Sequence, residues 1–425
     1  MTSNTTAAPA AETSHSEAAA PEKKSLALMV GLSAGHGIKH FGQSALLIIS
    51  PEIKATFALS EVAFGSLFAV QQTASGIANV PAGIISDMYR RRVAWILTAS
   101  MMTVALGYLI IGFSPWYWLI LTAVGLLGFG TSAWHSPAFG TLAAHYPQRR
   151  GVAMSAHLTG AQIGDTLGPL VIGALLGGFT FGIFNWVFDG FHWRTIAYLL
   201  FFPAALTALT VLLKLKTAGK ESTRNLNMKE YLASARVLVT NKGVLGMVVL
   251  GACRGAVHSA FLAFLVLYLR DDLVYSPFRV SMHVSLLTLA GIMSTPVMGM
   301  ISDRIGRKPV IVAAMSSMAV LVFMFLLFET GWPLAVLLGF LGLFFFSVFP
   351  IITAAAMDQV EKGSEASGTA LLFAGGAVIG SLSPVIAGFI YESSGFTGVV
   401  WFCGAIATVG AVLAIVLPMR RKAVL

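Results

Sequence analysis

GIISDMYRRR at residues 83–92 returns 216 residues later as GMISDRIGRK at residues 299–308. Each copy follows an apolar stretch and places an Asp four residues after a Gly, with basic residues behind it. Two further pairs repeat at nearly the same spacing: Gly160-x3-Gly164 with Gly376-x3-Gly380, and His36-x3-His40 with Arg254-x3-His258. Three matches at nearly one spacing indicate a duplicated unit, a layout that occurs in secondary transporters.

The composition indicates a protein whose solvent is lipid. Hydrophobic residues make up 56% of the 425 residues, charged residues only 11%, and the mean hydropathy is +0.81. A soluble domain carries charge on roughly a quarter of its residues. The two cysteines, Cys253 and Cys403, both lie in apolar runs, which excludes a disulfide framework or a cysteine metal motif. We expect no cofactor and no resident metal.

Runs of about 20 apolar residues predict twelve membrane-spanning helices, and hence an all-α membrane protein with two six-helix halves. The predicted spans are 26–50, 61–86, 93–113, 116–142, 151–178, 193–214, 243–269, 278–301, 309–328, 332–356, 366–390 and 396–418. The predicted organisation is a disordered tail (1–24), a first half (25–214), a linker with an amphipathic helix (215–242), a second half (243–418) and a short tail (419–425). The aromatic segment 179–192 is too short to span and is predicted to lie at the membrane interface.

The basic residues predict the orientation. With both termini in the cytoplasm, 21 Lys and Arg residues fall on the cytoplasmic side and four on the other, namely Lys54, Arg194, Arg270 and Arg279. This asymmetry obeys the positive-inside rule. The net charge of +9 is therefore explained by topology, and a nucleic-acid partner is not expected.

The repeated loop resembles the Gly-x-x-x-Asp-Arg-x-Gly-Arg-Arg pattern of the major facilitator superfamily. The second copy matches almost fully, whereas Met88 and Arg90 replace the usual Arg and Gly in the first. The resemblance covers about residues 25–420 and implies a monomeric secondary transporter of the bacterial inner membrane that works by alternating access. It also implies a latch for the outward-facing state, formed by Asp87, Arg91, Asp303, Arg304 and Arg307. A topological stop signal with a helix cap is the alternative interpretation.

The fifth predicted helix carries Gly160, Gly164, Gly168 and Pro169 at nearly regular spacing. Glycines spaced by four residues allow helices to pack backbone to backbone, and Gly-Pro bends a helix. The run resembles the antiporter motif of the same family, which implies proton-coupled export. Generic helix packing remains the alternative.

Ionisable residues inside predicted spans are costly in lipid and indicate function. In the first helix, His36, Lys39, His40 and Gln43 fall within an arc of about 100°. Arg254 and His258 share a face of the seventh helix, and Asp165 lies midway along the fifth. In the family fold these helices line a central cavity. The resemblance therefore implies a substrate-binding set made of the four residues of the first helix together with Arg254 and His258. His135 and His283 are interpreted as structural.

Two fixed cations and several histidines against one carboxylate predict a preference for a small organic anion as substrate. Asp165, His40 or His258 could carry a coupled proton. The structural alternative is that Lys39 pairs with Asp165 while the histidines bond to backbone carbonyls. His36 and His40 also have the spacing of two helical metal ligands, but Lys39 beside them and the lack of a nearby carboxylate argue against a cation.

A finer resemblance, to the fosmidomycin-resistance branch of the family, rests on the first and fourth helices. It is carried by Gly35-His36 with Phe41 and Gln43, and by the stretch 132–137, Ser-Ala-Trp-His-Ser-Pro. Trp134 and the Ser before Pro137 depart from the branch pattern. Fosmidomycin is an anionic phosphonate, in agreement with a cationic site.

The sequence therefore predicts a proton-coupled exporter of a small organic anion or drug, with uptake of an organic anion as the alternative. A metal-ion transporter or a non-transporting receptor is less well supported, because no large extramembrane domain is predicted. No P-loop occurs, which excludes an ATP-driven pump of that class, and no set of residues for an enzyme reaction is placed together.

The predicted topology can be tested at the linker. In a chain whose two native cysteines are replaced by Ala, Thr223→Cys should react with an impermeant maleimide only in inside-out vesicles, because the basic linker is retained in the cytoplasm. Labelling of Thr223→Cys in intact cells would contradict the assigned orientation.

Overall fold

A computed structural model describes residues 22–146, 148–181, 186–215, 240–359 and 365–419. The described chain is almost entirely helical. Its helices are α1 (Glu22–Phe57), α2 (Glu61–Met88), α3 (Val93–Phe113), α4 (Tyr117–Ala133), α5 (His135–His145), α6 (Arg150–Gly177), α7 (Trp193–Lys214), α9 (Lys242–Leu267), α10 (Pro277–Ile305), α11 (Arg307–Phe323), α12 (Gly331–Phe345), α13 (Val348–Met357) and α14 (Glu365–Val416). Short turns of helix lie at Arg90–Arg92, Tyr268–Asp272 and Met324–Leu326.

These helices give the twelve predicted spans. The pairs α4–α5 and α12–α13 are two broken spans, and α14 contains the last two spans, separated at Gly395, where φ is +61°. Glycine has no Cβ and adopts this left-handed conformation without strain. Within the described part of the chain, eight helical stretches are long and apolar enough to cross a membrane on length and hydropathy alone. The helices α1, α2 and α6 fall outside that set, and α1 and α6 carry most of the predicted polar site.

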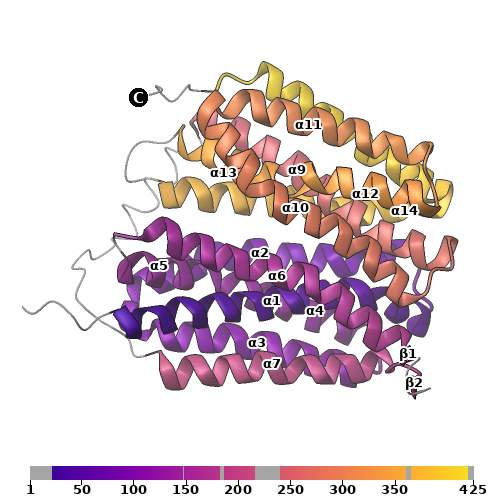
Figure 1. Cartoon of the computed structure of the whole chain (residues 1–425), viewed down its shortest axis with the longest axis horizontal. Coiled ribbons are helices and arrows are strands. Elements are labelled where there is room, and N and C mark those ends of the chain that lie inside the picture. Colours follow the sequence, from indigo (N-terminus) through magenta and orange to yellow (C-terminus); the bar gives the residue numbers. More distant parts are fainter. Residues whose placement is uncertain (1–21, 147, 182–185, 216–239, 360–364, 420–425) are drawn as a thin grey trace, which may run out of the picture.

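The spans form two bundles (Figure 1). The first half, coloured indigo to pink, lies in the lower part of the view, and the second half, orange to yellow, lies above it. The helix α1 begins, and α14 ends, at the same end of the molecule, where α7 stops at Lys214 and α9 starts at Lys242. We call this the linker end. The predicted linker helix, the N-terminal tail and most of the C-terminal tail lie outside the described residues.

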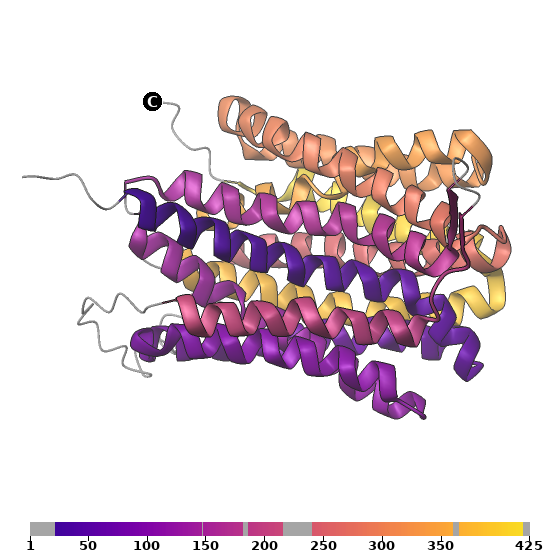
Figure 2. The same cartoon turned by 60° about the horizontal axis from the view of Figure 1, so that its bottom comes forward.

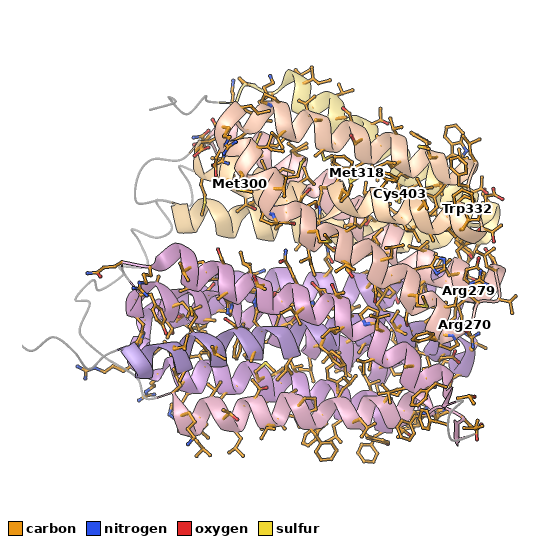
Figure 3. All side chains as sticks on the ribbon, in the orientation of Figure 1. Arg270, Arg279, Met300, Met318, Trp332 and Cys403 are labelled. Carbon is orange, nitrogen blue, oxygen red and sulfur yellow. The ribbon has the colours of Figure 1, made fainter. Side chains whose placement is uncertain are left out.

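The opposite end carries the four basic residues that the charge count assigned to one side of the membrane. Lys54 lies in the last turn of α1, and Arg194 lies at the start of α7. Arg270 and Arg279 lie at the same end of the molecule as Trp332 (Figure 3). The segment predicted to be interfacial is also here: residues 179–181 and 186–188 form a two-stranded antiparallel hairpin, β1–β2, seen edge-on at this end in Figure 2. We call this the hairpin end.

The helix α1 is longer than the sequence predicted, because it continues through Pro51 to Phe57 rather than ending near residue 50. Proline lacks the N–H that would bond to the carbonyl four residues earlier, which is Leu47. The Ser50 hydroxyl donates to that carbonyl at 2.8 Å. A serine hydroxyl replaces the missing N–H donor at Pro384 as well, where Ser383 donates to the Gly380 carbonyl at 2.8 Å. In both α1 and α14, the hydroxyl of the residue before the proline therefore satisfies the carbonyl that the proline leaves free.

Contacts between the two halves gather toward the hairpin end. Arg270 donates to Glu52 at 2.8 Å, and Lys54 pairs with Asp271 at 3.2 Å. Nearer the middle, Ser285 on α10 donates to the carbonyl of Thr166 on α6 at 2.9 Å. The halves are closed against each other at this end.

Glycines allow the helices to close there. A Cβ on Gly65 of α2 would collide with the Pro384 carbonyl of α14, and one on Gly388 would lie 2.6 Å from the Glu61 carbonyl. Likewise, a Cβ on Gly173 of α6 would collide with Ser281 of α10. The Ser281 side chain is fully buried by this packing.

The repeated loops differ in structure as they do in sequence. In the second copy, Gly306 ends α10 with φ of +97°, and Arg307 then pairs with Asp303 at 2.6 Å and reaches Asp358 at 3.5 Å. In the first copy, where Arg90 replaces the glycine, a short 3-10 turn follows α2 instead. The side chain of Asp87 lies outside the described residues, and Arg304 is exposed. The latch role of these residues stays a prediction.

The glycine contacts predict how to hold the hairpin end open. Gly65→Val should separate the halves there, because overpacking at a backbone contact costs about 1–3 kcal/mol, or roughly 5- to 150-fold in population. The readout is maleimide labelling of Ser281→Cys in detergent, in a chain free of other cysteines, and the rate should rise at least about fivefold. Gly140→Val is the matched control, because a Cβ there meets no atom within 4 Å. An equal rate in both variants would show that Gly65 does not limit opening.

Candidate functional site

Lys39 is the most unusual side chain in the first half. It lies near the middle of α1, and none of its surface is exposed. Its Nζ donates to the Thr131 carbonyl at 3.3 Å and lies 2.8 Å from Nε2 of His135. Within the described residues, no carboxylate forms an ion pair with it, so the predicted alternative in which Lys39 pairs with Asp165 is wrong. A buried cation without a counter-ion is costly in a membrane.

The break between α4 and α5 supplies the acceptor for Lys39. Pro137 cannot donate the helical bond, and α4 ends at Ala133. The last four carbonyls of a helix have no partner within it and must be satisfied from outside. Ser100 on α3 donates to Gly130 at 2.6 Å, and Lys39 donates to Thr131. The lysine therefore stabilises the end of a broken helix.

Asp165 pairs with a different residue of α1. Both of its carboxylate oxygens lie 3.1 Å from Nδ1 of His40, and the Ser44 hydroxyl donates to Oδ1 at 3.2 Å. The side chains of His40 and Asp165 are 22% and 29% exposed, so this pair, unlike Lys39, can be reached from outside the packed helices. It joins two of the residues predicted for proton coupling.

Three more histidines surround this pair. His36 is buried, its ring stacks on that of His157 at 4.0 Å between centroids, and its Nδ1 donates to the His157 carbonyl at 2.9 Å. His135 contacts the ring of His36 edge-on at 5.3 Å. The interpretation of His135 as structural stays a prediction, and α5 places this residue beside Lys39. The sequence signals at His135 were its position two residues before a helix-breaking proline and its place in the stretch 132–137 that carries the finer resemblance.

Close packing of α6 on α1 assembles these groups. A Cβ on Gly160 would collide with the Ser33 carbonyl, and one on Gly164 would collide with the Gly37 carbonyl. A Cβ on Gly168 would lie 2.9 Å from the carbonyl of Phe41. The predicted glycine motif therefore packs two helices of the same half, and this contact brings Asp165 within reach of His40.

The second half has a related arrangement around Arg254, which lies midway along α9. Its Nε and Nη2 donate to the Phe345 carbonyl at 3.2 and 2.6 Å, and its guanidinium lies over the ring of Phe349 at 5.3 Å. Phe345 ends α12, and Pro350 follows at the third position of α13, as Pro137 does in α5. His258 stacks on the Phe345 ring at 4.9 Å.

Each half therefore has a cation on its first helix that binds the carbonyl end of its broken fourth helix. The predicted substrate-binding residues divide into two groups. His36, Lys39 and His40 lie in the first half, with Gln43 half-buried on the same helix, and Arg254 and His258 lie in the second. The hydrogen bonds and ring contacts that the described structure gives these residues each lie within one half. His283 donates to the Arg279 carbonyl at 2.7 Å, which agrees with its structural interpretation.

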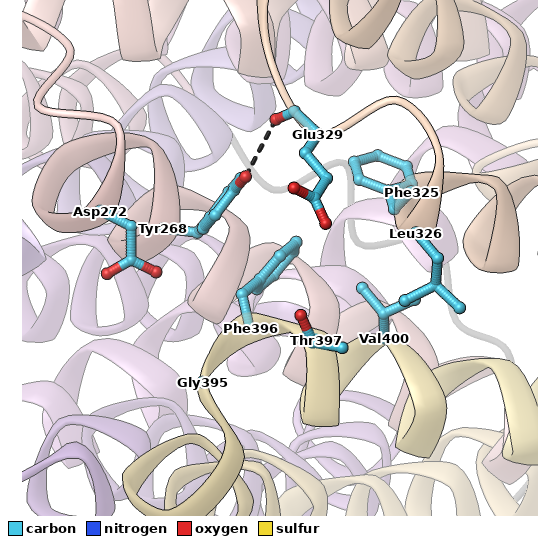
Figure 4. Close-up of a pocket in the computed structure, with 9 residues that line it drawn as sticks. All are labelled: Tyr268, Asp272, Phe325, Leu326, Glu329, Gly395, Phe396, Thr397 and Val400. Atoms are coloured by element: carbon cyan, nitrogen blue, oxygen red, sulfur yellow. Dashed lines mark hydrogen bonds between the residues drawn. The ribbon is translucent and has the colours of Figure 1, made fainter.

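Two cavities lie away from these groups. One, of about 550 Å³, lies at the hairpin end between the halves and is lined by Glu52, Trp193 and Arg270 among others. The other, of about 220 Å³, lies within the second half (Figure 4). There Tyr268 donates to the Glu329 carbonyl at 3.0 Å and stacks on Phe396. Neither cavity is lined by a predicted substrate-binding residue.

Comparison with known proteins agrees with this architecture. The chain is 23% identical over 402 residues to the fosmidomycin resistance protein of Escherichia coli, covering 94% of each chain. It is 27% identical over 287 residues to the multidrug resistance protein MdtG of Enterobacter lignolyticus, covering 65% of this chain and 64% of that protein.

Solved transporters share the fold. A bacterial homologue of the human lysosomal transporter Spinster, inward-facing and occupied, superposes with a TM-score of 0.77 at 14% identity, over 94% of this chain and 97% of that one. The D-xylose-proton symporter gives 0.71 at 18% identity, over 92% and 97%. The profile described as Major Facilitator Superfamily matches residues 32–273 and 247–424. The chain belongs to the major facilitator superfamily and is a multi-pass membrane transporter, not an enzyme.

Proposed function

We propose that this transporter exports a small organic anion across the bacterial inner membrane, with both termini in the cytoplasm and protons as the coupling ion. The observation that carries the proposal is Lys39, a fully buried lysine that forms no ion pair with a carboxylate among the described residues. A bound anion would supply the missing negative charge in the binding state. The named function of a relative, fosmidomycin resistance, supports both export and an anionic substrate.

Charge-assisted recognition in this site would use both halves. Lys39 and the imidazoles offer donors from α1, while Arg254, although bound to Phe345, keeps Nη1 for a ligand. Arginine and lysine with imidazole donors suit carboxylate, phosphate or phosphonate groups. His36, Gln43 and His258 complete the proposed substrate-binding set.

The His40–Asp165 pair is the proposed proton-coupling element. A carboxylate that accepts from a histidine and a hydroxyl, yet remains partly exposed, can exchange a proton with water and also change its partner. When Asp165 takes up a proton, it loses its charge and its hold on His40, so that the pair can change partner between the two states of the transport cycle. The glycine packing of α6 on α1 makes the two helices move as one.

Lys39 can be tested by ligand binding. Lys39→Gln should weaken the binding of fosmidomycin, or of another anion identified by a thermal-shift screen, by at least about 30-fold, because a charge-assisted contact to a buried ligand is worth about 2 kcal/mol or more. Lys308→Gln is the matched control, since Lys308 also donates to a carbonyl, that of Leu417, but lies near the linker end. Equal affinity in Lys39→Gln and the unaltered protein would remove the support for an anionic substrate.

Arg254→Ala is expected to lower the melting temperature as well as anion affinity, because it also leaves the Phe345 carbonyl unpaired at a cost of about 1.5–3 kcal/mol. Arg254→Lys should restore part of both, since a point charge cannot offer the planar fork. Loss of stability with unchanged affinity would assign Arg254 a structural role only.

Asp165 can be tested by transport. In proteoliposomes, Asp165→Asn should abolish flux driven by a pH gradient while anion exchange remains measurable, because the amide cannot bind and release the proton. Everted vesicles establish the direction, since export in cells appears there as uptake. Gradient-driven flux that survives in Asp165→Asn would transfer the coupling role to His40 or His258.

A further inference from the structure

Three histidines from two helices converge beside Lys39. The helix α1 contributes His36 and His40, and α5 contributes His135, so that one ring nitrogen from each lies within 4.8 Å of the others. We propose that these three imidazoles form a site for a divalent transition-metal ion, such as Zn²⁺, Co²⁺ or Ni²⁺, for which Lys39 competes.

The hydrogen bonds of the rings favour metal binding. Nδ1 of His36 is held by the His157 carbonyl, and Nδ1 of His40 is held by Asp165. Histidines that ligate metals have their other ring nitrogen bound in this way to a carbonyl or carboxylate, which fixes the tautomer and the ring orientation. With Nδ1 protonated, Nε2 of His36 and Nε2 of His40 each carry a lone pair that can bind a metal ion. Nε2 of His36 is buried and has no hydrogen-bond partner in the described structure.

The geometry requires only a modest closure. Zinc–nitrogen bonds of about 2.0–2.1 Å at a tetrahedral ion place two ligand nitrogens about 3.3 Å apart. The separation of up to 4.8 Å therefore has to shrink by about 1.5 Å at most, which rotation of the imidazole rings can supply. Three protein ligands leave a fourth position for water or an anion.

The sequence argued against a bound cation on two grounds, the charge of Lys39 and the lack of a nearby carboxylate. The structure removes the second ground. A carboxylate does lie close, because Asp165 contacts His40, so the site has a negative charge in its outer shell. Lys39 remains the opposing group, with Nζ at 2.8 Å from Nε2 of His135, the lone pair that a metal would use. A metal ion and the protonated lysine therefore exclude one another, and Lys39 sets how tightly the site binds metal.

The test uses Co²⁺ and Zn²⁺ with the purified full-length protein, freed of any purification tag. Co²⁺ should give visible ligand-field absorption that saturates at one equivalent, and Zn²⁺ should displace it. His36→Ala and His40→Ala should each weaken binding at least about tenfold, because loss of even an outer-shell partner of a metal site costs about 10- to 100-fold in affinity. His283→Ala is the control, since that histidine bonds to its own helix near the hairpin end.

Lys39→Gln gives the decisive result, because removal of the competing ammonium should tighten metal binding at least about tenfold. The same variant should weaken anion binding, so the two readouts move in opposite directions, and metal binding can succeed or fail whatever the transported substrate. Should His36→Ala fail to fold, His40→Ala, at a partly exposed side chain, still decides the matter. The proposal is overturned if neither the unaltered protein nor Lys39→Gln binds Co²⁺ saturably, or if binding is indifferent to His36 and His40.

Discussion

A carbonyl left without a donor inside a membrane must find one in the protein, and this constraint organises both halves of the transporter. Many of its described helices contain proline. At Pro51 and Pro384 the helix continues, and the serine beside the proline donates to the freed carbonyl, as Ser50 and Ser383 do. Where the helix ends outright, a cation from the first helix of the half reaches the exposed terminus, as Lys39 and Arg254 do. The charges of the predicted site are thus also structural.

This double role suggests how substrate and conformation can be linked. In the described structure the hydrogen bonds of Lys39 go to a helix terminus and to an imidazole, and a directly bound anion competes well for it. An anion that draws Lys39 away from Thr131 would loosen the α4–α5 junction. The α4–α5 junction and the bound anion would then compete for the ammonium group of Lys39.

The two halves use the same scaffold for different chemistry. Around Lys39 the neighbours are imidazoles and one carboxylate, groups that exchange protons and bind metals. Around Arg254 they are the rings of Phe345 and Phe349, with His258 stacked on Phe345. The first half therefore gathers several imidazoles and a carboxylate, whereas the second half sets one guanidinium and one imidazole among aromatic rings.

The sequence alone determined the membrane fold, the two halves and the identity of the buried charges, because hydropathy and the repeat at 216 residues are local and periodic signals. It placed Lys39, His40 and Asp165 at mid-membrane, since depth follows from distance along a helix. It could not pair them. Asp165 lies 125 residues from His40 and 126 from Lys39 in the chain. Only the close packing of α6 on α1 at Gly160 and Gly164 decides that Asp165 pairs with His40 rather than with Lys39. The same holds for His135, which reaches Lys39 because the fourth span breaks before Pro137, and the direction of a break is a property of tertiary packing.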